Sequence, residues 1–286
     1  MQLDQTAPAP GITSGGASLR IGTVALTVRD LDSMSRFYRE VIGLAPVATG
    51  PRVHKLGVGG RVLLELRHDP QAALADRGDA GLFHTAFLLP SRADLADWLL
   101  RAARTGARLD GASDHLVSEA LYLTDPEGNG IEIYRDRPSE EWPLDAAGLI
   151  GMATRRLDLD DLAADASPRP AQGMPAGTIV GHVHLQVGDL KTAEDFLAGT
   201  IGIPVTSRYP GATFFGADGY HHHLGANVWN SRGAGPRPER RTGLDAITFV
   251  AAPAVLERLE PRLSRTDDGT LVARDPWGAR LAFAEQ

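Results

Sequence analysis

The chain has 286 residues, and its 29 lysines and arginines against 36 aspartates and glutamates give a formal net charge of −7. This length allows two domains with separate cores, and 43% hydrophobic with 23% charged residues is typical of a globular protein. The acidic balance argues against binding to nucleic acid or to a polyanionic substrate, and no apolar run is long enough to span a membrane. Cysteine is absent, so a metal would have to be held by histidine, aspartate and glutamate.

Two irregular stretches divide the chain. Residues 1–19 are rich in glycine, serine, alanine and proline and predict a flexible arm. They show neither the basic nor the apolar region of a secretory signal, so we expect a cytoplasmic protein. Residues 138–177 end in SPRPAQGMPAG and predict a linker. We therefore expect one domain over residues 20–137 and a second over residues 178–286.

An internal repeat relates the two expected domains. Residues 22–31 read GTVALTVRDL, and residues 181–190 read GHVHLQVGDL. In each copy the alternating pattern predicts a strand, the Asp-Leu pair opens a helix, and a glycine, Gly43 or Gly202, ends it.

Two further segments repeat in the same order. HTAFLLP at 84–90 and DAITFV at 245–250 predict strands that lead into helices, while DPEGNGIEIY at 125–134 and DPWGARLAF at 275–283 predict a tight turn and a last strand. The chain is therefore predicted to be an α+β protein made of four strand–helix–strand–strand–strand units. We call them modules 1 to 4, at about residues 20–70, 80–137, 178–231 and 241–286.

Three segments, DHLVSEALYLTDPEGNGIEIYRDRP, GHVHLQVGDL and GYHHHLGANVW, resemble the vicinal oxygen chelate superfamily, which includes glyoxalase I and the extradiol ring-cleaving dioxygenases. Within it, the chain looks most like the two-domain catechol 2,3-dioxygenase-like proteins. The resemblance covers nearly everything after residue 20. It implies four βαβββ modules that pair into two cups of curved mixed sheet with flanking helices. It also implies a divalent metal inside a cup, held by residues on the first and last strands of the modules.

The resemblance assigns a ligand position to each of these strands. On the first strands of modules 1 to 4 the positions hold Thr23, His84, His182 and Asp245, and on the last strands they hold Glu65, Glu132, Leu224 and Ala282. If module 2 pairs with module 3, then His84, Glu132 and His182 surround one point. Two histidines and one carboxylate are the ligand set of non-haem Fe(II) oxygen chemistry. Pairing modules 1 with 2 and 3 with 4 would leave only His182 in the second cup. We therefore favour the 2–3 and 1–4 pairing, with a metal-free, structural 1–4 cup.

The extradiol signature is matched by His115, Leu121-Tyr122, Asp125-Pro126, Gly128 and Glu132, with a departure at Ser113, where the pattern asks for Gly, Asn, Thr, Ile or Val. The resemblance implies that His115 and Tyr122 lie beside the metal. His115 would act as an acid/base group, and Tyr122 would donate a hydrogen bond.

A run of three histidines follows in module 3. On a strand, His222 would face the inside of the cup and its two neighbours the other side, which makes His222 a candidate acid/base or oxygen-binding residue. The alternative is a half-exposed strand whose histidines satisfy backbone groups. His184 shares a face with His182 and is the alternative metal ligand.

The leading prediction is a non-haem Fe(II) extradiol dioxygenase that opens a catechol-type ring with O2, with Mn, Zn and Ni as alternative metals. Leu224 cannot supply the fourth ligand of a glyoxalase-type site, which favours the dioxygenase. A glyoxalase-type lyase or isomerase with Zn or Ni stays open, and so does a metal-free binding protein, suggested by Thr23 and Ala282. We expect a small aromatic diol and O2 as partners and no nucleic acid or membrane, and leave open whether the chain forms a homo-oligomer.

Overall fold

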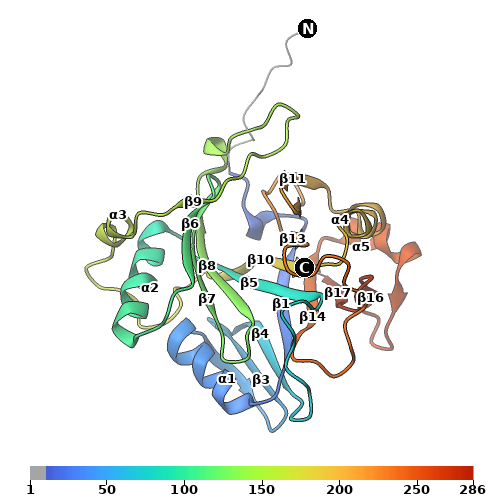
Figure 1. The fold of residues 1–286 in the computed structure, drawn as a ribbon, viewed down its shortest axis with the longest axis horizontal. Coiled ribbons are helices and arrows are strands. Elements are labelled where there is room, and N and C mark those ends of the chain that lie inside the picture. Colours follow the sequence, from blue (N-terminus) through green and yellow to red (C-terminus); the bar gives the residue numbers. More distant parts are fainter. Residues whose placement is uncertain (1–10, 286) are drawn as a thin grey trace.

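The computed structural model describes residues 11–285. Within them the strands form one sheet of eight strands and one of nine (Figure 1). None of the helices in this part of the chain is long and apolar enough to cross a membrane.

Each module repeats the predicted unit. Module 1 comprises β1 (Leu19–Val28), α1 (Leu31–Phe37), β2 (Ala45–Thr49), β3 (Val53–Val58) and β4 (Arg61–His68). Module 2 comprises β5 (Gly81–Leu88), α2 (Arg92–Thr105), β6 (Gly111–Asp114), β7 (Ser118–Thr124) and β8 (Gly130–Asp136). Module 3 comprises β10 (Ile179–Gln186), α4 (Leu190–Glu194), β11 (Val205–Tyr209), β12 (Ala212–Phe215) and β13 (Leu224–Asn227). Module 4 comprises β14 (Gly243–Ala251), α5 (Pro253–Leu259), β15 (Ser264–Arg265), β16 (Leu271–Arg274) and β17 (Arg280–Glu285).

The predicted helix start and stop signals act as expected in modules 1 and 3. The Asp30 carboxylate accepts a hydrogen bond from the backbone N–H of Ser33, and the Asp189 carboxylate accepts one from Thr192, so that each aspartate caps its helix. Both helices widen into π-helical turns, η2 (Tyr38–Ile42) and η4 (Asp195–Ile201). The turns end at Gly43 and Gly202, whose φ angles of 95° and 81° lie in the left-handed region that favours glycine.

The sheets pair the modules as the sequence analysis favoured. In the eight-stranded sheet, β1 of module 1 lies antiparallel to β14 of module 4. In the nine-stranded sheet, β5 of module 2 lies antiparallel to β10 of module 3. The proposed boundary at 138–177 therefore separates modules along the chain, while each sheet is shared by both halves of the chain.

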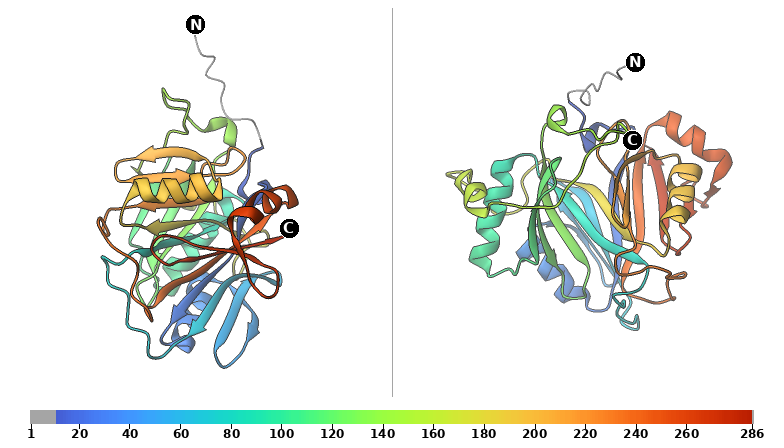
Figure 2. Two further views of the ribbon diagram at one scale, coloured as in Figure 1. Left: turned by 90° about the vertical axis from the view of Figure 1, so that its right-hand side faces the viewer. Right: turned by 45° about the horizontal axis from the view of Figure 1, so that its top comes forward.

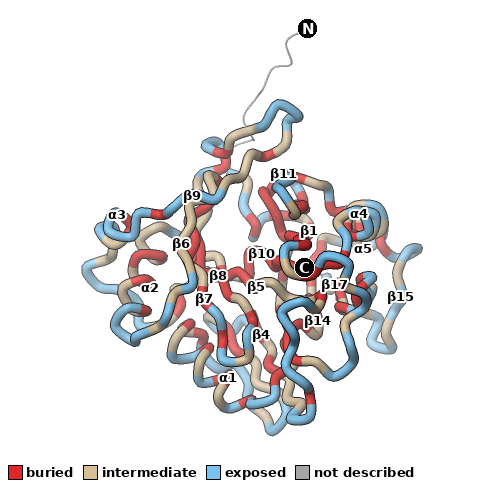
Figure 3. The backbone as a smooth tube through the Cα atoms, viewed as in Figure 1, coloured by how far each residue is buried: buried red, intermediate tan, exposed pale blue. Residues whose placement is uncertain are grey.

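The two faces of the nine-stranded sheet differ in character. Phe87, Ile133 and Val183 point to a continuous hydrophobic core that also contains residues of α2 and of the eight-stranded sheet. The alternate residues, including Ala86 and Glu132, point to the concave face, because side chains on a strand alternate. The helices lie outside the sheets, with α2 and α3 on one flank and α4 and α5 on the other (Figures 1 and 2). Buried backbone concentrates on the strands between them (Figure 3).

Residues 138–177 carry elements of their own: η3 (Ser139–Glu141), β9 (Arg155–Arg156) and α3 (Leu159–Ala164). Strand β9 extends the nine-stranded sheet beyond β6, and α3 packs on α2. Near the N-terminus, η1 (Ser14–Gly16) packs on β10, where the Ser14 hydroxyl donates a 3.0 Å hydrogen bond to the carbonyl of Gly181. Residues 1–10 of the expected arm lie outside the described residues.

Candidate metal centre

Three predicted ligands converge on the concave face of the nine-stranded sheet. Glu132 Oε2 lies 3.0 Å from His84 Nε2 and 3.1 Å from His182 Nε2, and the two Nε2 atoms are 3.3 Å apart. All three side chains are buried. Among the described residues, they form the group of histidine and acidic side chains whose ligand atoms meet closely enough to hold one metal ion.

Strand register explains why these atoms meet. His182 on β10 pairs with Ala86 on β5, and Ala86 pairs in turn with Glu132 on β8. The three residues form one row across the sheet, and the small central methyl group leaves a gap between the two outer side chains. His84 enters that gap from the neighbouring row, two residues before Ala86.

Two glycines in this neighbouring row allow β8 and β13 to pack closely against β5 and β10. Gly130 pairs with His84, and a Cβ atom there would lie 2.1 Å from the carbonyl oxygen of Phe83. Gly225 pairs with His184, and a Cβ atom there would lie 2.8 Å from the His184 ring. Neither position tolerates a larger side chain without displacing a neighbour.

The electrostatics favour the protonation states that bind metals. Burial alone would raise the pKa of Glu132, but His182 and His84 outweigh it and hold that pKa well below its usual range. Burial lowers the pKa of His182 to about 4, against the pull of Glu132. At neutral pH the centre therefore presents a carboxylate and a neutral imidazole, which are the forms that coordinate metals.

The spacing of the three donor atoms fits one first-row divalent ion. Such ions bind nitrogen and oxygen at roughly 2.0–2.2 Å, so that two ligands at right angles lie roughly 3 Å apart. The observed separations of 3.0, 3.1 and 3.3 Å are close to this value. Two histidines and one carboxylate on one face leave positions for other ligands, as in non-haem iron centres.

His84, Glu132 and His182 form a triangle of donor atoms. His115 and Tyr122 form a hydrogen-bonded pair beside this triangle. His115 Nδ1 donates to the carbonyl of Ala153 at 2.7 Å, and His115 Nε2 lies 2.7 Å from the Tyr122 hydroxyl. In a neutral imidazole the second nitrogen then accepts, so Tyr122 donates to it. Burial and the nearby Glu132 carboxylate raise the pKa of Tyr122 well above its usual value, which keeps the phenol protonated.

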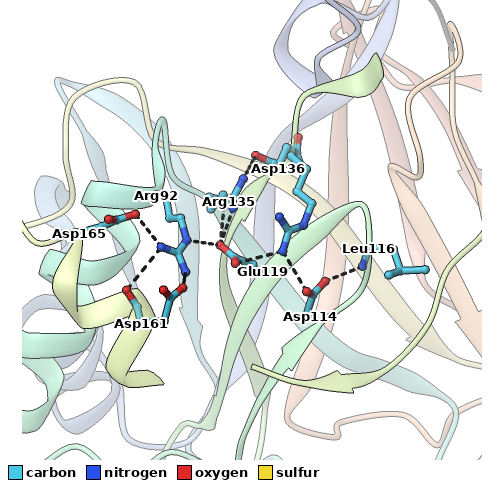
Figure 4. A network of polar contacts seen from close by, with 9 residues as sticks. Arg92, Asp114, Leu116, Glu119, Arg135, Asp136, Asp161 and Asp165 are labelled. Carbon is cyan, nitrogen blue, oxygen red and sulfur yellow. Dashed lines mark hydrogen bonds and ion pairs between the residues drawn. The ribbon is translucent and has the colours of Figure 1, made fainter. Parts of the chain in front are cut away.

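An ion-pair network anchors the turn that carries His115 (Figure 4). Leu116, the next residue, has a φ of 72°, a strained value for a residue with a side chain. Its backbone N–H donates to Asp114 Oδ1, and Asp114 Oδ2 accepts from Arg137. Arg137 also binds the buried Glu119, which binds Arg92 and Arg135 as well. The turn is therefore fixed from two neighbouring strands.

The three consecutive histidines precede β13 instead of lying on a strand, which corrects the expectation for this run. His222 nevertheless lines the cavity above the triangle, and its ring centroid is 4.1 Å from that of His182. His221 turns away from the cavity and contacts His222 and Asp136. His223 accepts a hydrogen bond from the backbone N–H of Ala217.

His184, the alternative ligand, lies outside the triangle. Its ring packs between Phe83 and Trp229, at centroid distances of 5.1 and 5.5 Å. Its Nε2 atom is buried and has no hydrogen-bond partner within the described chain. Burial and the neighbouring histidines hold the pKa of His184 well below its usual value.

A cavity of about 390 Å³ opens over these residues. Its lining includes all six predicted site residues, namely His84, His115, Tyr122, Glu132, His182 and His222. One wall is formed by residues 152–154, from the segment predicted to be a linker. The sequence carried no signal for this wall, because it forms where β9 adds to the sheet edge and brings Ala153 to His115.

The concave face of the eight-stranded sheet carries a different set of contacts. Arg67 binds Glu65 at 2.8 Å and also binds Asp245, while Lys55 binds Glu65 at 3.2 Å. Cationic side chains thus neutralise the two acidic residues that the resemblance had placed at ligand positions in modules 1 and 4.

The register also corrects two of the aligned positions by one residue. On the first strand of module 4, Ala246 and not Asp245 occupies the position that His84 has in module 2. On the last strand of module 3, Gly225 and not Leu224 occupies the position that Glu65 has in module 1. The four pairings that fix these positions run without a register shift. Neither alanine nor glycine offers a donor side chain.

Comparisons with known proteins agree with this architecture. The sequence model of the glyoxalase/bleomycin resistance protein/dioxygenase superfamily matches residues 20–133. The chain is 42% identical to catechol-2,3-dioxygenase of Bacillus subtilis (strain 168) over 243 residues, which cover 84% of this chain and 85% of that protein. It is 29% identical to biphenyl-2,3-diol 1,2-dioxygenase 3 of Rhodococcus globerulus over 128 residues, covering 41% of this chain and 63% of that protein.

Solved structures share the fold at low sequence identity. Glyoxalase I from Zea mays superposes with a TM-score of 0.55 at 15% identity, covering 95% of this chain and 94% of that one. A protein of Bacillus subtilis described as a dioxygenase superposes with a TM-score of 0.61 at 14% identity, covering 94% and 86%. Together with the four modules and their paired sheets, these similarities show that the chain belongs to the glyoxalase/bleomycin resistance protein/dioxygenase superfamily, whose fold is that of the vicinal oxygen chelate proteins.

Proposed function

We propose that this chain is an extradiol dioxygenase that holds Fe(II) on His84, Glu132 and His182 and opens a catechol-type ring with O2. The observation that carries the proposal is the convergence of two buried imidazoles and one carboxylate at the base of a cavity. The 42% identity to a catechol-2,3-dioxygenase supports the same reaction class.

The proposed reaction balances without an external reductant. The carbon–carbon bond beside the diol breaks, and both atoms of O2 enter the product. When bound, Fe(II) supplies Lewis acidity toward the diol and exchanges electrons with O2. The protein contributes binding, orientation and proton transfer.

His222 and the His115–Tyr122 pair have complementary roles in this proposal. His222 lines the cavity next to His182 and takes a proton from a substrate hydroxyl. Tyr122 keeps its own proton, since its pKa is raised by burial and by Glu132, and when the diol binds, its hydroxyl turns from His115 and donates the hydrogen bond to an oxygen of the diol. His115, oriented by the Ala153 carbonyl, then has a free Nε2 that accepts a proton from the substrate and returns it.

The two rival functions are less well supported by the geometry. A glyoxalase-type lyase would need a fourth ligand from module 3, where the register places Gly225. A metal-free binding protein would not need two histidines and a glutamate within 3.3 Å of one another. A buried carboxylate between two imidazoles is costly unless a cation joins it.

The first experiment measures metal content after anaerobic purification and reconstitution with Fe(II). Wild type should hold one iron per chain and show catechol-dependent oxygen uptake. His182→Ala should lose both iron and activity. His184→Ala is the matched control, because it removes an imidazole from the same face of the same strand but outside the triangle, and it should keep its iron.

Each alternative has a distinct outcome. Iron retained in His182→Ala but lost in His184→Ala would move the site to His184. A chain that binds Zn or Ni and shows no oxygen uptake would favour the lyase. A chain that binds no metal would contradict the proposal in favour of a binding protein.

A further inference from the structure

Aromatic side chains line the cavity beside the predicted site residues. They are Phe83, Tyr209, Phe214 and Trp229. The ring of Phe83 lies 5.3 Å from that of His84, measured between centroids. Tyr209 and Trp229 are 37% and 46% exposed and are among the largest exposed apolar side chains, so the mouth of the cavity lies beside them.

The aromatic mouth is pre-arranged. The Trp229 ring lies 5.4 Å from the Phe83 ring, and its indole N–H donates a 2.9 Å hydrogen bond to the carbonyl of Pro210. Gly211 beneath it is required, because a Cβ atom there would lie 2.8 Å from the indole. A fixed aromatic surface binds a flat apolar group at little entropic cost.

The described lining of the cavity provides no cationic side chain for a negatively charged substituent. Among the described residues that line it, none is lysine or arginine. The carboxylate of Glu132 is a metal ligand in the proposed function, and the lining offers no cationic side chain to a charged substituent.

We propose, building on the proposed function, that the substrate is an uncharged catechol bearing an apolar, preferably aromatic, substituent, and that this substituent lies against Phe83 and Trp229. A volume of about 390 Å³ lies within the range of pockets that enclose ligands of more than one ring, roughly 300–1,000 Å³. Carboxylated catechols are rejected because their charge would be desolvated without a partner.

The test compares kcat/KM for oxygen uptake by the Fe(II)-loaded enzyme on two matched pairs of diols. The first pair is 3,4-dihydroxybenzoate and its methyl ester, which are similar in shape but differ in charge. The second pair is catechol and phenylcatechol, with the phenyl group at position 3 or 4. We expect kcat/KM for the ester to be roughly tenfold or more above that for the acid. We expect the same difference between the better phenylcatechol and catechol.

Trp229→Ala tests the location of the substituent. It should lower kcat/KM for the phenylcatechol by roughly tenfold while changing that for catechol by less than threefold, and Trp229→Phe should restore most of the difference. Equal losses on both diols, or a preference for the acid over its ester, would contradict this inference alone. Absence of turnover with every diol would contradict the proposed function itself, and this inference with it.

A second, independent observation concerns Asp136 and His221 behind the cavity wall. Asp136 Oδ1 lies 2.8 Å from His221 Nε2, and His221 Nδ1 lies 2.7 Å from His222 Nδ1. The other oxygen of Asp136 accepts a 2.9 Å hydrogen bond from the Tyr220 hydroxyl. His221 is fully buried and takes no part in the function described above.

These contacts determine which nitrogen of His222 carries the hydrogen. A carboxylate can only accept, so His221 Nε2 donates to Asp136, and Nδ1 of a neutral His221 must accept. His222 Nδ1 is then the donor, which leaves His222 Nε2 unprotonated. We infer that Asp136 and His221 are positioning residues that set this tautomer and leave His222 Nε2 as the hydrogen-bond acceptor for a substrate hydroxyl.

The tautomer of His222 is directly measurable by ¹⁵N NMR of histidine-labelled full-length chain loaded with diamagnetic Zn(II). Wild type should show His222 protonated at Nδ1. His221→Phe, which retains the ring packing, and Asp136→Ala should both shift the proton toward Nε2 and lower kcat at least tenfold with little change in KM. Asp136→Glu should restore the wild-type tautomer in part.

Tyr134→Phe serves as the control, since it removes a hydroxyl that contacts Tyr220 at 2.9 Å and leaves the Asp136–His221–His222 contacts in place. It should change neither the tautomer nor kcat. An unchanged His222 tautomer in both His221→Phe and Asp136→Ala would overturn the inference, even if activity fell.

Discussion

His182 and Glu132 lie on strands that do not pair with each other, yet His182 Nε2 and Glu132 Oε2 are 3.1 Å apart. The strand between them, β5, contributes Ala86 to the same row. The metal centre therefore depends on a residue that is not itself a ligand. Only a small side chain at Ala86 leaves space for the side chains of His182 and Glu132 to approach each other above it.

Replacing Ala86 should abolish metal binding without removing a ligand. Ala86→Leu places an isobutyl group in the gap between His182 and Glu132, where the site is fully buried. Overpacking of this kind costs about 1–3 kcal/mol, so the chain should fold while its iron content falls below a tenth of wild type. Elemental analysis and a thermal melt measure the two effects. Thr85→Val, on the opposite face of the same strand, should keep its iron, and an Ala86→Leu variant with full iron would contradict the row geometry.

Tyr122→Phe should separate proton handling from metal binding. The variant removes the hydroxyl that contacts His115 Nε2 at 2.7 Å but leaves the triangle intact. Since acid/base groups contribute roughly 10²–10⁴-fold, kcat should fall by about 100-fold while iron content and KM for the diol stay within about twofold. Steady-state oxygen uptake and metal analysis give these values. A loss of iron in this variant would instead assign Tyr122 a structural role at the centre.

Glu119 should dominate the stability of the network in Figure 4. Its side chain is buried and binds Arg92, Arg135 and Arg137, so that Glu119→Ala leaves three arginines without their shared partner. Breaking a buried ion pair costs about 3–5 kcal/mol, and the melting temperature should fall by about 6–20 °C. Asp161→Ala removes an exposed partner of Arg92, with 69% of the Asp161 side chain accessible, and should cost less than about 1 kcal/mol. Equal losses in the two variants would show that burial of Glu119 does not govern the network.

The free energy of unfolding should fall as the pH falls below 6.5, in part because of His223. Burial lowers the pKa of His223 to about 3, mainly by desolvation. The unfolded chain, with a histidine pKa of about 6.5, then binds more protons than the folded chain at lower pH. This residue alone should cost about 2 kcal/mol of stability between pH 6.5 and pH 5.

The matched variant for this effect is His223→Gln, which keeps an acceptor for the backbone N–H of Ala217. Denaturant unfolding at pH 6.5 and pH 5 should show a difference in unfolding free energy that is smaller in the variant by about 2 kcal/mol. An identical pH dependence in both proteins would mean that His223 is protonated in the folded state.

Much of the fold follows from local patterns that can be read along the chain. Alternating apolar residues predict the strands, Asp30 and Asp189 start helices because a carboxylate satisfies free backbone N–H groups, and Gly43 and Gly202 end them because they adopt left-handed angles. The repeat of these signals predicts four modules. The residue types of His84, Glu132 and His182 similarly indicate a metal centre, since chemistry limits which side chains bind iron.

Other features depend on distances that no local pattern encodes. The pairing of β10 with β13 and of β14 with β17 puts Gly225 and Ala246, and not the aligned Leu224 and Asp245, at the ligand positions. Residues 152–154 become a cavity wall only because β9 joins a sheet edge. Sequence alone determined the modules and the chemistry they carry, because propensity and capping act between near neighbours. Tertiary structure decided which modules share a sheet and which atoms meet, because β pairing joins residues far apart in the chain and one extra residue in a strand changes every partner after it.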